Sequence, residues 1–233
     1  KIGVVDGDQI NLSNLHRQVL FGEKDLGKNK AEVAVRHFQN KYSDIQWEIF
    51  PEMITNSNAE ELISGYDLII DGSDNFPTRY LVNDACVLLD KPLVFGAIYQ
   101  HEGQVAVFNW GEKACNYRDV YPQMPSAAEI PNCAETGVLG VLPGIIGNLM
   151  ALEAIKVLSG FGKPLKNRML FFNSISSQSY EVEISPNSKG RNAIPGSIQD
   201  LHALDYELAC EGVKQLTWNE AMRKMNSDVA FVD

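Results

Sequence analysis

Short apolar runs alternate with amphipathic segments along the first half of the chain. Residues 2–5 and 67–71 are apolar runs that each end at an acid. After these runs, apolar residues recur at helical spacing in residues 28–42 and again from about residue 76 to 90. This alternation predicts an α/β fold whose parallel strands are joined by right-handed helical crossovers.

The pattern predicts further elements along the rest of the chain. Residues 45–50 alternate as in a half-buried strand, whereas residues 67–71 are typical of a fully buried parallel strand. The other predicted elements are a short helix capped by Asn58, strands at 93–97 and 104–109, a helix at 142–158 closed by Gly160, and an antiparallel pair at 169–173 and 180–184. We therefore predict a Rossmann-like, mainly parallel sheet with antiparallel strands in its C-terminal part.

Two segments interrupt this pattern. Residues 110–139 contain three prolines and show little periodicity, which predicts a long surface loop, and such loops usually carry function. Residues 186–210 begin with many Pro, Gly, Ser and Asn residues, as linkers do. We divide the chain accordingly into a domain at 1–185, a linker at 186–210, and the start of another domain at 211–233.

Composition narrows the class of protein. The 233 residues are 45% hydrophobic and 21% charged, as in a globular protein with a sizeable core. A net charge of −10 without any basic run argues against nucleic acid as a partner. The four cysteines lie far apart, and neither a signal peptide nor an unbroken transmembrane run is evident. These features predict a cytoplasmic protein with reduced thiols and no membrane partner.

Acidic residues follow two of the predicted strands. Asp6 follows the first strand, where nucleotide-binding α/β sheets carry an acid that hydrogen-bonds a ribose hydroxyl. Asp8 would either stabilise the turn or support the site by orienting another of its residues. Asp74 follows a later parallel strand, where it would suit Mg²⁺ beside substrate phosphates. Its alternative is a helix N-cap, a role that Asn75 could also fill.

Two cations lie where a polyphosphate could use them. Arg17 ends a polar loop, and its planar guanidinium suits phosphate oxygens. Lys30 lies in the first turn of the predicted helix, where free N–H groups already favour anions. A solvated surface position is the alternative for each, but their occurrence together with Asp6 and Asp74 favours phosphate binding.

Four motifs in family order resemble the MoeB/ThiF family, which is related to ubiquitin-activating enzymes. They are Asp6-Gly7-Asp8, Ser13-Asn14-Leu15-His16-Arg17-Gln18, Gly27-Lys28-Asn29-Lys30-Ala31-Glu32 and Asp71-Gly72-Ser73-Asp74-Asn75. The resemblance covers residues 1 to about 184. It implies an adenylyltransferase that uses ATP and Mg²⁺ to activate the C-terminal glycine of a ubiquitin-fold sulfur carrier. That carrier would be MoaD- or ThiS-like, would end in Gly-Gly, and would serve molybdopterin or thiamine synthesis.

The resemblance also implies the roles of individual residues and a homodimer. ATP would be bound by Asp6, Asp8, Asn14, Arg17, Gln18, Lys30 and Asp74. Of these, Arg17, Lys30 and Asp74 would act in catalysis, with Asp74 also binding Mg²⁺. In parts of the family, a cysteine placed like Cys133 forms a thioester or acyl-disulfide with the carrier, whereas a buried structural thiol is the alternative.

The sequence departs from the family in three ways. Many members carry two Cys-x-x-Cys pairs that suit zinc, but here only Cys115 stands in the first position and residues 185–193 have no cysteine, so we predict no structural zinc. The family's glycine-rich strand, turn and helix would precede Lys1, which predicts a fold truncated at its N-terminus and leaves open whether this stretch alone is active. Residues 211–233 resemble the opening of a rhodanese-like domain, whose active-site loop would lie further on.

Two other functions stay open at this point. A nicotinamide-dependent dehydrogenase would use Asp6 for a ribose, but it leaves Arg17, Lys30 and Asp74 without a shared purpose. A non-catalytic module would bind a ubiquitin-fold partner without any dependence on ATP.

Overall fold

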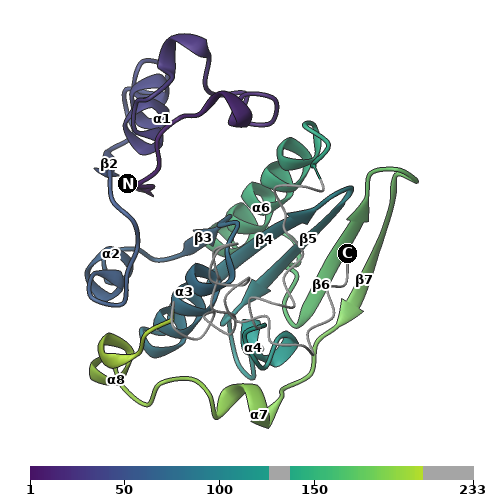
Figure 1. The fold of residues 1–233 in the computed structure, drawn as a ribbon. Helices are drawn as coiled ribbons and strands as arrows, with labels where there is room; N and C mark the ends of the chain where they lie inside the picture. Colours follow the sequence, from purple (N-terminus) through teal and green to yellow (C-terminus); the bar gives the residue numbers. More distant parts are fainter. Residues whose placement is uncertain (126–136, 207–233) are drawn as a thin grey trace, which may run out of the picture.

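The computed structural model describes residues 1–125 and 137–206, and its strands form two sheets. In the smaller sheet, β1 (Ile2–Val5) and β2 (Trp47–Phe50) are parallel. The larger sheet has the order β3-β4-β5-β6-β7, with bounds Ile69–Asp71, Leu93–Tyr99, Glu102–Phe108, Arg168–Asn173 and Gln178–Glu183. Figure 1 shows the smaller sheet and α1 (Lys30–Gln39), here called the N-terminal unit, set beside the larger sheet.

Helices cover both faces of the larger sheet. α3 (Phe76–Leu88) and α4 (Tyr117–Val120) pack on one face around Phe95 and Phe108. α6 (Leu142–Ser159) packs on the other face, against Val94 and Val105 of the same strands. The remaining short elements are η1 (Leu12–Asn14), η2 (Glu23–Asp25), α2 (Ala59–Ser64), α7 (Ser188–Arg191) and α8 (Ile198–Ala203). The strand residues alternate between the two hydrophobic clusters, as the period of a strand requires.

Local sequence explains where the two longest helices begin and end. The side chain of Asn75 caps α3 by accepting the Thr78 N–H at 2.9 Å, and Pro77 occupies the first turn. α6 ends at Gly160, which has a positive φ of 69°. α6 also approaches the sheet closely, because a side chain at Gly96 would collide with Met150. The caps thus set where α3 begins and where α6 ends, and Gly96 lets α6 pack closely on β4.

The predicted fold class is confirmed, and the structure differs from the sequence reading in detail. β4 and β5 are antiparallel because only residues 100 and 101 join them, and so short a connection forms a hairpin. β3 is not fully buried: Ile70 is 52% exposed, since β3 pairs only with β4 among the described strands. α6 is buried on its inner face only, and Leu152 and Ile155 on its outer face are exposed.

By length and composition, α6 is apolar enough to cross a membrane, with a mean hydropathy of 1.4 over 18 residues. Its inner side chains nevertheless contact β4 and β5, and Leu142 and Ile146 are buried in the cluster formed there. In this structure α6 is therefore a layer of the α/β fold.

Residues 185–206, here called the C-terminal strap, return across the α3 face of the sheet. Arg191 forms an ion pair with Asp119 at 2.9 Å, and Leu201 is fully buried in the cluster on this face. The Tyr206 hydroxyl donates a 2.7 Å hydrogen bond to Asp84 of α3. These residues lie within the predicted linker, and the division into domains stays a prediction because residues 207–233 lie outside the described part of the chain.

Candidate functional site

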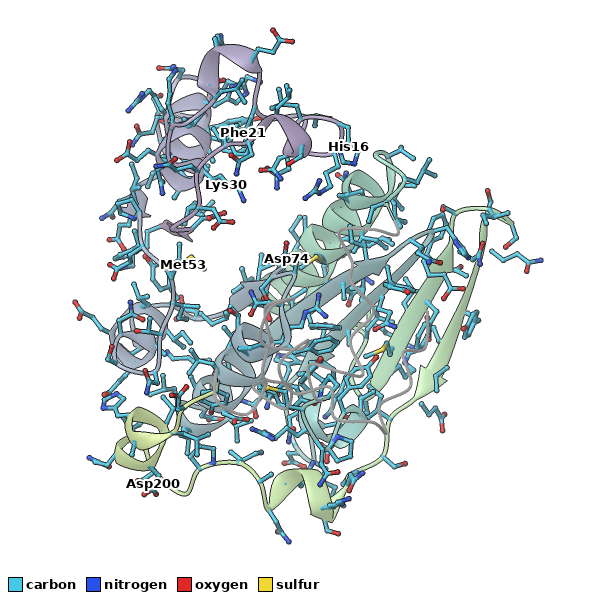
Figure 2. The ribbon with its side chains drawn as sticks, viewed as in Figure 1. His16, Phe21, Lys30, Met53, Asp74 and Asp200 are labelled. Atoms are coloured by element: carbon cyan, nitrogen blue, oxygen red, sulfur yellow. The ribbon has the colours of Figure 1, made fainter. Side chains whose placement is uncertain are left out.

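The predicted ribose acid and the predicted metal acid follow the ends of strands in different sheets. Asp6 follows β1 and is partly buried, whereas Asp74 lies beyond the end of β3 and is exposed. Figure 2 shows Lys30 on the N-terminal unit and Asp74 at the end of β3 that is turned toward this unit. Lys30 and Asp74, which are far apart in sequence, thus lie on parts of the fold that face each other in this view.

Lys30 is held in place by the loop that follows β1. Its ammonium lies 2.8 Å from Asp8 Oδ2, and its side chain is only 12% exposed. The backbone N–H of Lys30 donates to the Asp8 carbonyl at 2.9 Å. Asn29 caps α1 and donates its side-chain N–H to the Asp6 carbonyl at 2.8 Å. Asp8 therefore orients Lys30, which is a supporting role that the sequence left open.

The charges of this region act together on Asp6. Burial raises the pKa of Asp6, and the Asp8 backbone N–H, which donates to Asp6 Oδ1 at 2.9 Å, lowers it, as does the positive charge of Lys30. The carboxylates of Asp8 and Asp74 raise the pKa further. A cation or a hydrogen-bond donor brought by a ligand would relieve this repulsion between acids.

The loop around Arg17 is ordered by its own backbone. The Arg17 guanidinium donates to the Ser13 carbonyl at 2.9 Å, and the Asn14 side chain accepts the Asn11 N–H at 3.3 Å. Gln18 Oε1 is buried and has no hydrogen-bond partner among the described residues. Asn14 therefore shapes the loop, while Gln18 keeps an acceptor that a ligand could use.

The turn that precedes α6 supports this loop through Gly140. A side chain at Gly140 would collide with the carbonyl oxygen of His16. The neighbouring Leu139 N–H donates to the Gln100 carbonyl at 3.3 Å, which ties the same turn to the end of β4. The loop of Arg17 therefore rests on the larger sheet through a contact that needs a glycine.

The Gly140→Ala variant is expected to lose about 1–3 kcal/mol of unfolding free energy, because the loop of His16 must move to admit the methyl group. Urea denaturation measures the loss, and hydrogen exchange at residues 12–18 should become faster. Gly144→Ala is the matched control, since its methyl group would meet no atom within 4 Å and would favour the helix. Equal stability of both variants would show that the loop does not depend on this contact.

The structure bears on one of the two readings of Asp74, the N-cap. Asn75 caps α3, so Asp74 is not needed as the N-cap. In the part of the chain that the structure describes, no hydrogen bond or ion pair engages the Asp74 carboxylate, and no group of three or more His, Cys, Asp or Glu residues gathers as a metal cage. An exposed single carboxylate fits the usual protein contribution to Mg²⁺, which is one or two carboxylates beside substrate phosphates.

The two cysteines among the described residues, Cys86 and Cys115, are both buried. Cys115 is buried, and its Sγ lies 3.5 Å from the Ile184 carbonyl oxygen. Burial and the nearby Asp119 raise the pKa of Cys115, which disfavours its thiolate, although Arg191 opposes them. Cys133 lies outside the described residues, so its role, like the absence of zinc, stays a prediction.

Sequence reasoning missed two residues that build the site. Asn29 precedes an apolar helix, which is the usual signature of an N-cap, but its second contact with the Asp6 carbonyl has no sequence signal. Arg79 donates through two nitrogens to the Ser73 carbonyl beside Asp74, at 3.1 and 2.8 Å. Because arginines in helices are usually solvated, only the fold could reveal this contact.

Together these residues are the candidate site for a charged nucleotide. Lys30 and Arg17 provide cations, Asp6 provides an acceptor for hydroxyl groups, and Asp74 provides a free carboxylate. Phosphate groups and a divalent cation would balance the charges of these residues.

Comparisons with known proteins agree with this description. Residues 1–193 match the ThiF family. The chain is 48% identical over 215 residues to the sulfur carrier protein adenylyltransferase of Thermus thermophilus, covering 90% of this chain and 79% of that protein. It is 40% identical over 212 residues to the adenylyltransferase and sulfurtransferase MOCS3-1 of Zea mays, covering 89% of this chain but only 45% of that protein.

Solved structures show the same fold. The crystal structure of Escherichia coli MccB with ATP superimposes with a TM-score of 0.68 at 22% identity, covering 80% of this chain and 57% of that one. Another crystal structure of Escherichia coli MccB gives a TM-score of 0.69 at the same identity, covering 79% of this chain and 56% of that one. The chain thus spans just over half the length of these structural neighbours.

Proposed function

The chain belongs to the ThiF family, and from this premise we propose that it catalyses ATP-dependent adenylylation of the C-terminal glycine of a ubiquitin-fold sulfur carrier. The names of the Thermus and maize relatives support this activity. The observation that carries it is the cluster that follows β1, in which Asp6 accepts the Asp8 N–H at 2.9 Å and the Asp8 carboxylate holds the Lys30 ammonium at 2.8 Å. The charge of Asp74, beyond the end of β3, also acts on Asp6.

In this reaction a carboxylate oxygen of the carrier's last glycine attacks the α-phosphorus of ATP. The new bond joins this oxygen to the α-phosphorus, and the bond from the α-phosphorus to the oxygen bridging to the β-phosphate breaks. Pyrophosphate leaves with that electron pair, and the carrier becomes an acyl adenylate. The attacking carboxylate is ionised near neutral pH, so the step needs no general base. The site must instead align two anions and neutralise their charge.

Each residue has one task in this scheme. Asp6 accepts a hydrogen bond from a ribose hydroxyl, and Arg17 and Lys30 neutralise the phosphates. Asp8 keeps the Lys30 ammonium at the site through the 2.8 Å ion pair. Asp74 would hold Mg²⁺, which when bound spreads the negative charge of the phosphates. Asn14 shapes the loop of Arg17, and Gln18 contributes an acceptor, unpaired among the described residues, near the phosphates.

Finer points belong to the same proposal. The carrier would end in Gly-Gly and would serve either molybdopterin or thiamine synthesis in the cytoplasm. We further propose a homodimer, in which a second copy covers the outer face of α6. Leu152, Ile155 and Leu158 are exposed there, at 42, 56 and 63%, and monomers rarely expose contiguous apolar side chains.

Exchange of labelled pyrophosphate into ATP tests the activity directly in the full-length protein. Exchange is expected only with Mg²⁺ and a carrier that has a free C-terminal glycine, because the acyl adenylate must form and reverse. A carrier without its last glycine is the matched control. Assays with a molybdopterin-type and a thiamine-type carrier decide between the pathways.

Two outcomes would favour the other functions. Carrier binding of equal affinity with and without ATP, and no exchange with either carrier, would indicate a non-catalytic binding module. Tight binding of NAD and none of ATP would indicate a dehydrogenase, which gives Lys30 and Asp74 no shared role.

A further inference from the structure

The turn that presents Asp74 is fixed from the inside by Asp71. Asp71 is the last residue of β3 and is 6% exposed. Its Oδ1 accepts the backbone N–H of Ser73 at 2.8 Å. This bond fixes the orientation of the peptide plane between Gly72 and Ser73, because the N–H must point at a buried, immobile carboxyl group.

The next peptide plane is fixed from the other side by Arg79. Nε and Nη2 of Arg79 donate to the Ser73 carbonyl oxygen at 3.1 and 2.8 Å. The guanidinium also lies 5.5 Å from the ring centre of Phe76 and 5.7 Å from that of Phe95. Two donors and two rings leave this side chain little freedom, since a guanidinium is planar and its donors are fixed relative to each other.

The two anchored peptides together set the direction of the Cα–Cβ bond of Asp74. The Ser73 carbonyl and the Asp74 N–H belong to one rigid plane, so holding the oxygen restricts the backbone on both sides of that plane. On the following side, Asn75 is fixed as the cap of α3. The Asp74 carboxylate itself is exposed, so its position depends on its backbone and on no side-chain contact among the described residues.

We propose that Arg79 and Asp71 are positioning residues for Asp74, with no contact of their own to the nucleotide. This inference rests on the proposed adenylylation and adds the residues that place its metal-binding carboxylate. Residues that orient a metal ligand commonly change metal affinity or activity when they are replaced.

Arg79→Lys tests the proposal because lysine keeps the charge but cannot place two fixed donors on one carbonyl. We expect kcat of carrier-dependent exchange to fall by about 10- to 100-fold, and half-saturating Mg²⁺ to rise by a similar factor. KM for ATP should change little. Binding of Mn²⁺, followed by electron paramagnetic resonance with a nonhydrolysable ATP analogue, should weaken by a similar factor, a readout independent of turnover.

Arg36→Lys is the matched control, because the Arg36 side chain is 68% exposed on α1 and its ion pair with Glu32 spans 4.0 Å. It should leave every readout unchanged. An Arg79→Lys variant that is folded and binds Mn²⁺ normally would overturn the proposal. A rise in KM for ATP at unchanged kcat would also overturn it, because that result identifies Arg79 as a direct nucleotide ligand.

Two substitutions at Asp71 test whether its acceptor oxygen is needed for metal binding. Asp71→Asn keeps an oxygen that can accept the Ser73 N–H, so its Mn²⁺ affinity should stay within a few-fold of the original. Asp71→Leu removes the acceptor at similar volume and should weaken Mn²⁺ binding by about tenfold or more. Equal Mn²⁺ binding by the two folded variants would contradict the role of Asp71.

The two proposals fail in distinguishable ways. If the unaltered protein shows no carrier-dependent exchange, the adenylylation itself is wrong. The role of Arg79 and Asp71 is then still decided by the Mn²⁺ and nucleotide titrations, which need no carrier. If exchange occurs and the Arg79 and Asp71 variants match the unaltered protein in every readout, only the positioning role is wrong.

Discussion

Asp74→Ala is expected to reduce carrier-dependent ATP–pyrophosphate exchange by at least about 100-fold, the usual cost of losing one electrostatic partner of the reacting groups. Asp74 supplies the free carboxylate at the end of β3, and the structure offers no neighbouring cluster of acids, within the described residues, that could replace it. The loss should appear mainly in kcat and should not be restored by raising ATP. Radiolabelled exchange measures both.

The control for this variant is Asp67→Ala. Asp67 is also an exposed acid, but it precedes β3 and therefore lies at the opposite end of the strand. The Asp67→Ala variant should retain full exchange activity. It tests whether the loss of one negative charge alone affects the exchange rate. Retention of more than a tenth of the activity by Asp74→Ala would show that another group binds the metal.

The largest expected change in stability comes from Asp84. This carboxylate is fully buried on α3 and accepts Arg118 Nε and Nη2 at 2.7 Å each and the Tyr206 hydroxyl at 2.7 Å. Asp84→Asn keeps the shape but leaves the buried Arg118 guanidinium without its counter-charge. Breaking a buried pair from one side costs about 3–5 kcal/mol of unfolding free energy, which urea denaturation of the full-length protein measures.

Two further variants compare the buried charge with a surface ion pair and with a single hydroxyl donor. Glu181→Gln breaks the surface ion pair with Arg168 and should cost less than about 1 kcal/mol, because both partners are exposed. Tyr206→Phe removes only a hydroxyl donor and should cost about 1–2 kcal/mol, less than Asp84→Asn. If Asp84→Asn were no more costly than Glu181→Gln, the buried network would not stabilise the fold.

The sequence indicated where two candidate site residues lie, because they follow the ends of strands. Asp6 comes directly after β1, and Asp74 lies three residues beyond the end of β3. The carboxyl ends of parallel strands are where ligands collect. The start of α1 also had a local signal, so Lys30 was placed correctly at a helix N-terminus. The β4–β5 hairpin was predictable too, since two residues cannot make a parallel crossover, but strand periodicity alone does not carry direction.

The contacts between distant segments were not predictable. Asn29, Arg79 and Tyr206 each reach residues that only the folded chain brings near, and none belongs to a pattern with a fixed period. One signal was available: Asn83 and Asp84 stand between apolar residues of α3, and a buried acid requires a partner. The sequence could thus predict a buried polar network on α3, but it could not identify Arg118 or Tyr206 as the partners.

The C-terminal strap determines where the domain can be trimmed for expression. A chain cut after residue 185 would lose both Arg191 and Tyr206, which would leave Asp119 without its ion pair and remove one donor from Asp84. It would also uncover the apolar surface that Leu201 fills. A boundary placed beyond Tyr206 keeps these contacts, so a shortened chain designed for expression should include the strap even though its composition is typical of a linker.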